Sequence, residues 1–202
     1  MERSFALRGP TLTLRPPGED DVADLYRLGS DPEVTRWFSW GPYRTADEPA
    51  AYVRRAAERL RAGVQLDLLM VHAEHGPVGV TGLSEWSMRD RRAIVGTWFG
   101  RPYWGTGLNA ESKALVGHLA FEIYDLQRLG AYADTRHARS QRALEKVGFV
   151  REGVLRAWHR HGDTQKDVAL YGLLRAEWQD SALREVAVAM SGSAPEVFAG
   201  GG

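Results

Sequence analysis

The stretch from Gly100 to Asn109, Gly-Arg-Pro-Tyr-Trp-Gly-Thr-Gly-Leu-Asn, most restricts how this chain can fold. It lies between an apolar run, Ala93–Phe99, and a helical pattern that runs from about Leu108 to Tyr124. A strand that leads through a glycine-rich loop into a helix brings unpaired backbone N–H groups and the positive end of the helix dipole to one place. Such an arrangement binds anions, most often phosphate. The sequence therefore predicts an anion-binding loop around which the rest of the fold is organised.

The segments on either side of this loop alternate between strand-like and helical patterns. Three expected strands separated by short turns form an antiparallel meander before the loop: Leu66–His72, Val78–Ser84 and Ala93–Phe99. Other strands are expected at Leu12–Leu14, Leu129–Ala133, Phe149–Trp158 and Lys166–Leu174. Helices are expected after Glu19, after Asp31-Pro32, from Thr45 to Arg61, from Leu108 to Tyr124, from Arg139 to Val147 and within Ala176–Met190. We expect one domain over 1–190 and a disordered tail over 191–202.

Composition excludes several classes of function. The 26 acidic and 26 basic side chains balance, whereas nucleic-acid-binding domains are usually strongly basic. No apolar run reaches the roughly 18 residues that a membrane span needs, and the N-terminus lacks the pattern of a secretory signal. There is no cysteine, which excludes disulfides, Cys-ligated metals and thiol catalysis. We therefore expect a cytoplasmic protein that binds neither a membrane nor nucleic acid directly.

The glycine loop also matches a dinucleotide-binding pattern, G-x-G-x-x-A, over residues 105–110. That pattern requires a tight turn directly after the first strand of a parallel βαβ unit. Here the glycines come halfway along the chain and follow an antiparallel meander, which disfavours a Rossmann domain. No Gly-Lys-Ser/Thr occurs, so the P-loop pattern is absent. A glycine pair that only ends a strand would not explain two glycines at a helix start.

Two motifs together resemble the GNAT acetyltransferases. Pro-Tyr-Trp-Gly-Thr-Gly between a strand and a helix is similar to their acetyl-CoA pyrophosphate loop, although Pro102 replaces the usual basic residue and Arg101 comes one position early. The segment from Asp134 to Gly153 resembles the RimJ/RimL-type branch, which acetylates protein N-terminal amines, with His137 where that branch usually has asparagine. The likeness extends over roughly residues 10–180.

The resemblance implies a fold and a cofactor site. The fold would be of mixed α/β (α+β) type, with a mostly antiparallel sheet of about seven strands flanked by helices. Its central strands would splay apart to hold the pantetheine arm of acetyl-CoA, the co-substrate. The arm would pair with the backbone of Trp98, Phe99 and Gly100, and the amides of Gly105, Thr106, Gly107, Leu108 and Asn109 would hold the pyrophosphate. His137 can hydrogen-bond the arm, and the thioester would lie near Ser140.

Acetyl transfer requires a neutral amine and a proton for the departing thiolate. The resemblance makes Ser140 the candidate proton donor, although a serine in the first turn of a helix can equally be a cap. Candidate bases are Asp167, Glu85 and Asp134, each of which can also be an ordinary exposed or ion-paired carboxylate. The resemblance favours Asp167, because related sequences carry an acid in the final strands. A strong base is not required for an α-amine, because its pKa near 8 leaves about a tenth of it neutral at pH 7.

The acceptor is the most open part of the prediction. In this family the segment between the first two helices lines the acceptor site, so Trp37, Phe38 and Trp40 are candidate substrate-wall residues. His159 and His161 share a strand face but lack a third ligand, and no metal is expected. The expected activity is direct acetyl transfer to a primary amine, with a protein N-terminal α-amine favoured. A small-molecule amine (antibiotic, polyamine or amino acid) and a non-catalytic acyl-CoA-binding module are the alternatives, and the protein would be a monomer or homodimer.

Overall fold

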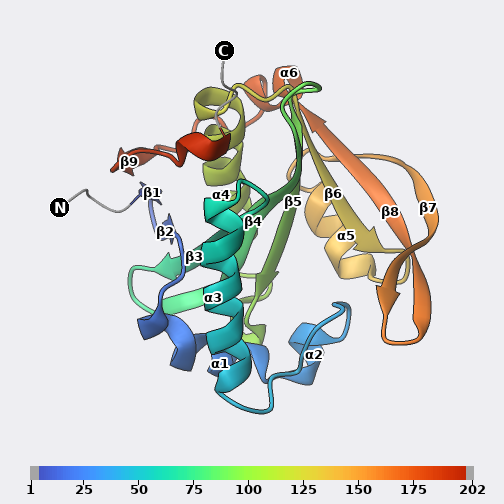
Figure 1. Cartoon of the computed structure of the whole chain (residues 1–202). Coiled ribbons are helices and arrows are strands. Elements are labelled where there is room, and N and C mark those ends of the chain that lie inside the picture. The colour runs from blue at the N-terminus through green and yellow to red at the C-terminus, as the bar shows by residue number, and fades with distance from the viewer. Residues whose placement is uncertain (1–4, 199–202) are drawn as a thin grey trace.

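The computed structural model describes residues 5–198. Its strands are β1 (Ala6–Arg8), β2 (Leu12–Arg15), β3 (Leu66–His72), β4 (Gly76–Ser87), β5 (Arg92–Phe99), β6 (Arg128–Asp134), β7 (Val150–His161), β8 (Thr164–Leu174) and β9 (Ala189–Ser191). They form one sheet in the order β7-β8-β6-β5-β4-β3-β2-β1-β9 (Figure 1). Neighbouring strands are antiparallel, with β5 and β6 as the parallel pair. This confirms the mixed, mostly antiparallel sheet and the β3–β4–β5 meander.

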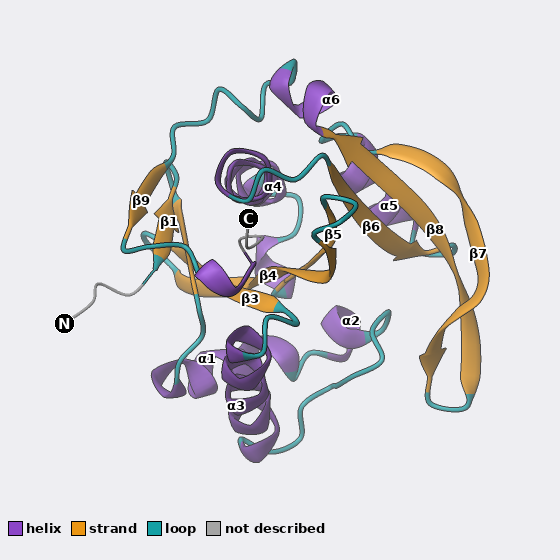
Figure 2. Cartoon of the chain, turned by 45° about the horizontal axis from the view of Figure 1, so that its top comes forward, coloured by secondary structure: helices purple, strands orange, loops and turns teal. Residues whose placement is uncertain are grey.

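Helices cover both faces of this sheet. They are α1 (Val22–Gly29), α2 (Pro32–Thr35), α3 (Asp47–Arg61), α4 (Leu108–Gly117), α5 (Ala138–Glu145) and α6 (Arg175–Gln179). Figure 2 shows α1 and α3 on one face of the central strands and α4 on the opposite face. No helix of the described residues is both long and apolar enough to cross a membrane.

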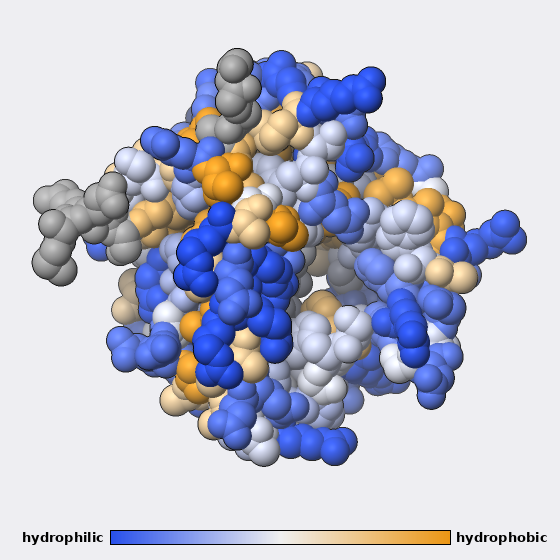
Figure 3. Space-filling view, viewed as in Figure 1, coloured by the Kyte–Doolittle hydropathy of each residue, from blue (hydrophilic) through white to orange (hydrophobic). Residues whose placement is uncertain are grey.

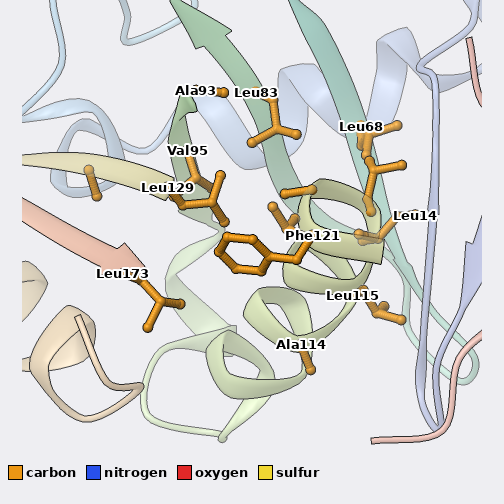
Figure 4. Packing of buried hydrophobic residues seen from close by; sticks show 14 of the residues in the cluster. Leu14, Leu68, Leu83, Ala93, Val95, Ala114, Leu115, Phe121, Leu129 and Leu173 are labelled. Atoms are coloured by element: carbon orange, nitrogen blue, oxygen red, sulfur yellow. The ribbon is translucent and has the colours of Figure 1, made fainter. Parts of the chain in front are cut away.

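The main hydrophobic core lies between the sheet and α4. Residues Ser112 to Gly117 of α4 are all buried, and the helix continues as a π-helical segment, His118–Ile123. Phe121 in that segment is fully buried and lies among side chains of the sheet, including Leu129 and Val95 (Figure 4). A helix that is buried on nearly every side anchors the glycine loop before it, so the loop's amides are held on a rigid support.

The two central parallel strands separate soon after they meet. β5 pairs with β6 only through Arg92–Ile94 and Arg128–Gly130. Beyond these residues β5 continues along β4, whereas β6 continues along β8. The strands therefore splay apart toward the end of β5, where the glycine loop begins.

The C-terminal region differs from the sequence prediction. The helix expected within Ala176–Met190 is only the short α6, and the chain then runs back so that β9 pairs with β1 at the far edge of the sheet. The disordered tail expected from residue 191 is wrong for residues 191–198, because Phe198 is buried and stacks on Trp86 with a ring-centroid distance of 4.5 Å. Residues 199–202 lie outside the described part.

Candidate active site

The loop between β5 and α4 presents backbone donors without partners. Gly105 and Gly107 have φ angles of +78° and +90°, which glycine adopts without strain. Trp104 N donates to Arg101 O, and Ala110 N donates to Gly107 O. The chain between these two donors contributes the five amides of residues 105–109. These amides donate to no protein acceptor within residues 5–198. A Cβ at Gly105 or Gly107 would meet no atom within 4 Å, so these amides border open space. The loop is therefore a preformed anion cradle at a helix N-terminus.

Trp104 joins this loop to α5. Its indole Nε1 donates a hydrogen bond of 2.9 Å to Phe99 O at the end of β5. The guanidinium of Arg139 lies 3.3 Å from the centroid of the Trp104 ring. This cation–π contact holds a positive charge beside the anion cradle and fixes the loop against the first turn of α5.

Two neighbouring cavities, which share several lining residues, extend from the loop into the splay. The outer one, of about 300 Å³, lies between β5, the glycine loop and α5. The inner one, of about 150 Å³, lies between the separated parts of β5 and β6. The residues that line both cavities include Phe38, Thr97, Asn109, His137 and Ser140. Figure 3 shows a hollow between the α3 side of the molecule and the side formed by β6–β8.

His137 lines both of these cavities. Its ring stacks on Trp37 with a centroid distance of 4.7 Å and an interplanar angle of 12°. Its Nε2 atom is buried and has no hydrogen-bond partner among the described residues. Burial, assisted by the nearby charge of Arg139, lowers the pKa of His137 to about 4. The imidazole is therefore neutral at physiological pH.

Ser140 is in the first turn of α5 and lines both cavities. The N-cap of that helix is His137, and no side-chain capping bond is present there. Within the described chain, the Ser140 hydroxyl makes no hydrogen bond to protein atoms. The helix-cap alternative for Ser140 therefore has no hydrogen bond to support it, and its hydroxyl is free to contact a ligand.

The three candidate bases have different surroundings. Asp134 lines the inner cavity, but Arg136 binds both of its oxygens at 3.0 and 2.9 Å, and these bonds hold the pKa of Asp134 below its ordinary value. Asp167 is exposed, lines neither cavity and accepts a 2.8 Å hydrogen bond from Ala157 N at a bulge in β7. Glu85 is exposed and accepts a 3.1 Å hydrogen bond from the hydroxyl of Tyr132, which lines the inner cavity.

The aromatic segment after α2 forms one wall of the cleft. Phe38 lines both cavities and Trp37 lines the inner one. Trp40 lines neither, but it stacks on Phe38 with centroids 5.4 Å apart and contacts Trp98 of β5 at 5.3 Å. The α2 segment is thereby held against β5 beside the splay.

A sequence model described as "Acetyltransferase (GNAT) domain" matches residues 11–150, which span the glycine loop, the splayed strands and α5. This chain belongs to the GNAT acetyltransferase family. The splay, the loop and the helix that begins near Ser140 therefore all lie within an acetyltransferase domain.

Individual relatives of this acetyltransferase agree with the assignment. The uncharacterized N-acetyltransferase p20 of Bacillus licheniformis is 25% identical over 168 residues, covering 83% of this chain and 94% of that protein. YdaF of Bacillus subtilis (strain 168), provisionally described as a ribosomal N-acetyltransferase, is 28% identical over 102 residues, or 50% of this chain and 55% of that protein. A Vibrio cholerae spermidine N-acetyltransferase, solved with CoA and spermine, has a similar fold, with a TM-score of 0.72, 18% identity and coverage of 84% of this chain and 99% of that one.

The sequence patterns did not single out several residues that line the two cavities, among them Tyr132, Arg139 and Lys113. Lys113 of α4 lines the inner cavity and is only 4% exposed. The sequence feature that could have indicated Lys113 is a lysine within a helix segment whose other residues are almost all apolar or small. That pattern does not say which side of the helix faces a cavity, because nearly every side of α4 is buried.

The two histidines on β7 do not form part of a metal cluster. The rings of His159 and His161 stack at 6.4 Å. In the part of the chain that the structure describes, no three His, Asp or Glu side chains are grouped as metal ligands.

The lowered pKa of His137 gives a pH prediction. In the unfolded chain histidine takes up a proton near pH 6.5, whereas folded His137 does so near pH 4, so acidification over this range favours unfolding. We expect a loss of about 1–2 kcal/mol from this group, reduced from the full shift because the ring is only half-buried. Between pH 7 and pH 4.5, the free energy of unfolding, measured with urea, should fall less in His137→Asn than in the wild type. An equal fall in the two proteins would contradict the buried, neutral imidazole.

Proposed function

We propose that this protein transfers the acetyl group of acetyl-CoA to a protein N-terminal α-amine, as RimJ/RimL-type enzymes do. The observation that carries the proposal is a pair of neighbouring cavities, both lined by Ser140, that extend from five free amides at a helix N-terminus into the splay of β5 and β6. The anion cradle and the apolar walls match the two chemically different halves of acetyl-CoA.

The residues present fit acetyl-CoA along the whole cleft. The amides of 105–109 would hold the pyrophosphate, and Arg139 and Lys146, which line the outer cavity, add positive charge for the phosphates. One edge of the Trp98–Gly100 backbone pairs with β4, and its other edge faces the splay, because the pairing of β5 with β6 has already ended. An extended arm can bind along this edge as an added strand. His137 Nε2 is the neutral side-chain nitrogen that would pair with that arm.

Acetyl-CoA supplies an activated thioester, and the chain's own residues position the acceptor and donate to the leaving group. With no cysteine in the chain, the amine attacks the thioester directly, without a cysteinyl intermediate. The free hydroxyl of Ser140 donates a hydrogen bond to the departing sulfur. The cleft walls hold the amine near the carbonyl, so positioning contributes much of the rate.

Among the candidate bases, Glu85 fits this chemistry best. Asp134 is held in its charged form by Arg136, and such a carboxylate is a weak base. Asp167 is committed to the β7 bulge. Tyr132 lines the inner cavity and donates to Glu85, so a proton released by the amine passes through the Tyr132 hydroxyl to that carboxylate.

The charge of the cleft favours an N-terminal amine over a polyamine. A polycation needs several unpaired carboxylates, but Asp134 is the one acidic residue that lines either of these cavities in the described chain, and it is paired with Arg136. A single α-amine needs no such cluster. The provisional description of YdaF agrees with this choice, and the spermine complex of the Vibrio cholerae protein represents the polyamine alternative.

Replacing Ser140 tests its proposed role. Ser140→Ala should lower turnover about 10- to 100-fold while the affinity for acetyl-CoA changes little, because the hydroxyl acts on the leaving sulfur and not on the phosphates. Steady-state kinetics, with acetylated peptide measured by mass spectrometry, gives the two constants separately. Ser112→Ala, which removes a buried hydroxyl of α4 outside both cavities, is the matched control and should keep wild-type turnover. Equal rates in the two variants would make Ser140 a purely structural residue.

A further inference from the structure

Lys113 is a buried lysine without an acidic partner. In the described residues no carboxylate lies within ion-pair distance of its Nζ atom, and the residue is only 4% exposed. Burying an unpaired ammonium is costly, and an apolar side chain at this position in α4 would avoid that cost. We therefore looked for a role of Lys113 other than a contribution to stability.

The hydrogen bonds around Lys113 can be assigned a direction. The Thr81 hydroxyl donates to Gly96 O at 3.1 Å, so in the 2.7 Å contact between Thr81 and Thr97 the proton comes from Thr97. Thr97 Oγ1 must then accept from Lys113 Nζ, which lies 2.6 Å away. The second acceptor of Lys113 is Asn109 Oδ1 at 3.3 Å. A protonated lysine has three N–H groups, and these contacts use two.

The remaining N–H group has no acceptor among the described residues. Lys113 lines the inner cavity together with Ser140, which comes from the opposite wall on α5. Asn109 ties the two walls together, since its Nδ2 donates to Ala143 O of α5 at 3.3 Å. The amine of Lys113 and the hydroxyl of Ser140 are therefore donors to the same small chamber, deeper in the splay than the anion cradle.

We propose that Lys113 is the group that gives a proton to the CoA sulfur as it leaves. This inference rests on the proposed function. As the acceptor nitrogen forms its bond to the acetyl carbon, the carbon–sulfur bond breaks and its electron pair stays on sulfur. The Lys113 ammonium passes one proton to that sulfur, which leaves as the thiol. The Lys113 side chain, now a neutral amine, regains a proton from solvent. The proton lost by the acceptor leaves separately, so the charges balance.

The acidity of Lys113 suits this role. Complete burial lowers its pKa to about 7, which makes the ammonium a stronger acid than an ordinary thiol of pKa near 8.5. The hydroxyl of Ser140 is far too weak an acid to give up its proton, so it contributes a hydrogen bond alone. The two donors thus have separate tasks.

Two substitutions separate the charge of Lys113 from its structural contacts. Lys113→Met removes the charge and the hydrogen bonds, whereas Lys113→Gln keeps a donor for Thr97 and Asn109 without a charge. We expect both variants to turn over about 100-fold more slowly than the wild type, with acetyl-CoA affinity changed less than about threefold. We also expect the wild-type rate to show a pH dependence near neutrality that both variants lose. Wild-type rates in either variant would overturn the proposal.

A titration tests the inference without turnover. Nuclear magnetic resonance of the lysine side chains, with CoA bound, reports the titration of Lys113 in the wild type, in Lys113→Gln and in Lys166→Met, whose lysine on β8 lines neither cavity. We expect one lysine to titrate near pH 7 in the wild type and in Lys166→Met, and none to do so in Lys113→Gln. A wild-type protein in which no lysine titrates near pH 7 would overturn the role of Lys113 while leaving the proposed function intact. A wild-type protein that fails to bind CoA would overturn both.

Discussion

Gly105→Asp should abolish the binding of CoA while leaving the fold intact. A side chain at this position would enter open space beside the free amides of the loop, because no atom lies within 4 Å of the place of its Cβ. The new carboxylate would occupy the anion cradle and repel the pyrophosphate. We expect an affinity loss of at least about 1,000-fold, from repulsion at contact distance together with lost amide contacts. Isothermal titration calorimetry with CoA measures this directly.

Two further variants separate charge from backbone strain. Gly105→Ala introduces strain at the positive φ, roughly 1–2 kcal/mol, without a charge, and should lose far less affinity than the aspartate. Gly162→Asp places the same side chain at another positive-φ glycine, in the turn between β7 and β8, and should bind CoA normally. Unchanged affinity in Gly105→Asp would show that the loop does not hold the phosphates.

Gly96→Phe should abolish turnover by filling the inner cavity. Gly96 lies on β5 where the strands have separated, lines that cavity and has open space where a Cβ would be. Its φ is not positive, so the strand accepts a side chain. A phenyl ring is large relative to a cavity of about 150 Å³, and it would keep the amine from the thioester. We expect a loss of at least about 100-fold in kcat/KM, since small displacements of reacting groups have effects of this size.

The matched control for this substitution is Gly153→Phe. Gly153 is on strand β7, has the same open surroundings and lines neither cavity. It should keep wild-type kinetics and a similar melting temperature. A fully active Gly96→Phe enzyme would mean that the acceptor does not reach the thioester through the inner cavity.

The parts of the fold with local signals could be predicted from the sequence. Alternation and short turns identify the β3–β4–β5 meander, and the glycines after β5 identify the loop and the start of α4. The N-cap at Asp31 is confirmed by its side chain, which accepts a 2.9 Å hydrogen bond from Glu33 N. Each of these features depends on residues close together in the chain.

Features that depend on distant contacts could not be predicted. The stack of Trp37 on His137 joins positions a hundred residues apart, and no local pattern reports it. The burial of Phe198 depends on Trp86, which is even farther away in sequence. Asp167 matched a family position, but its bond to Ala157 N arises from a bulge that the strand pattern does not reveal.

Release of the CoA thiol from acetyl-CoA, measured with the wild-type protein across N-terminal peptides, polyamines and aminoglycosides, tests the central claim most directly. We predict thiol release that requires the amine, with the highest kcat/KM for an N-terminal peptide and an acetyl group on its α-nitrogen by mass spectrometry. Tight binding of CoA with no thiol release for any amine in the panel would contradict this account and indicate a non-catalytic acyl-CoA-binding protein.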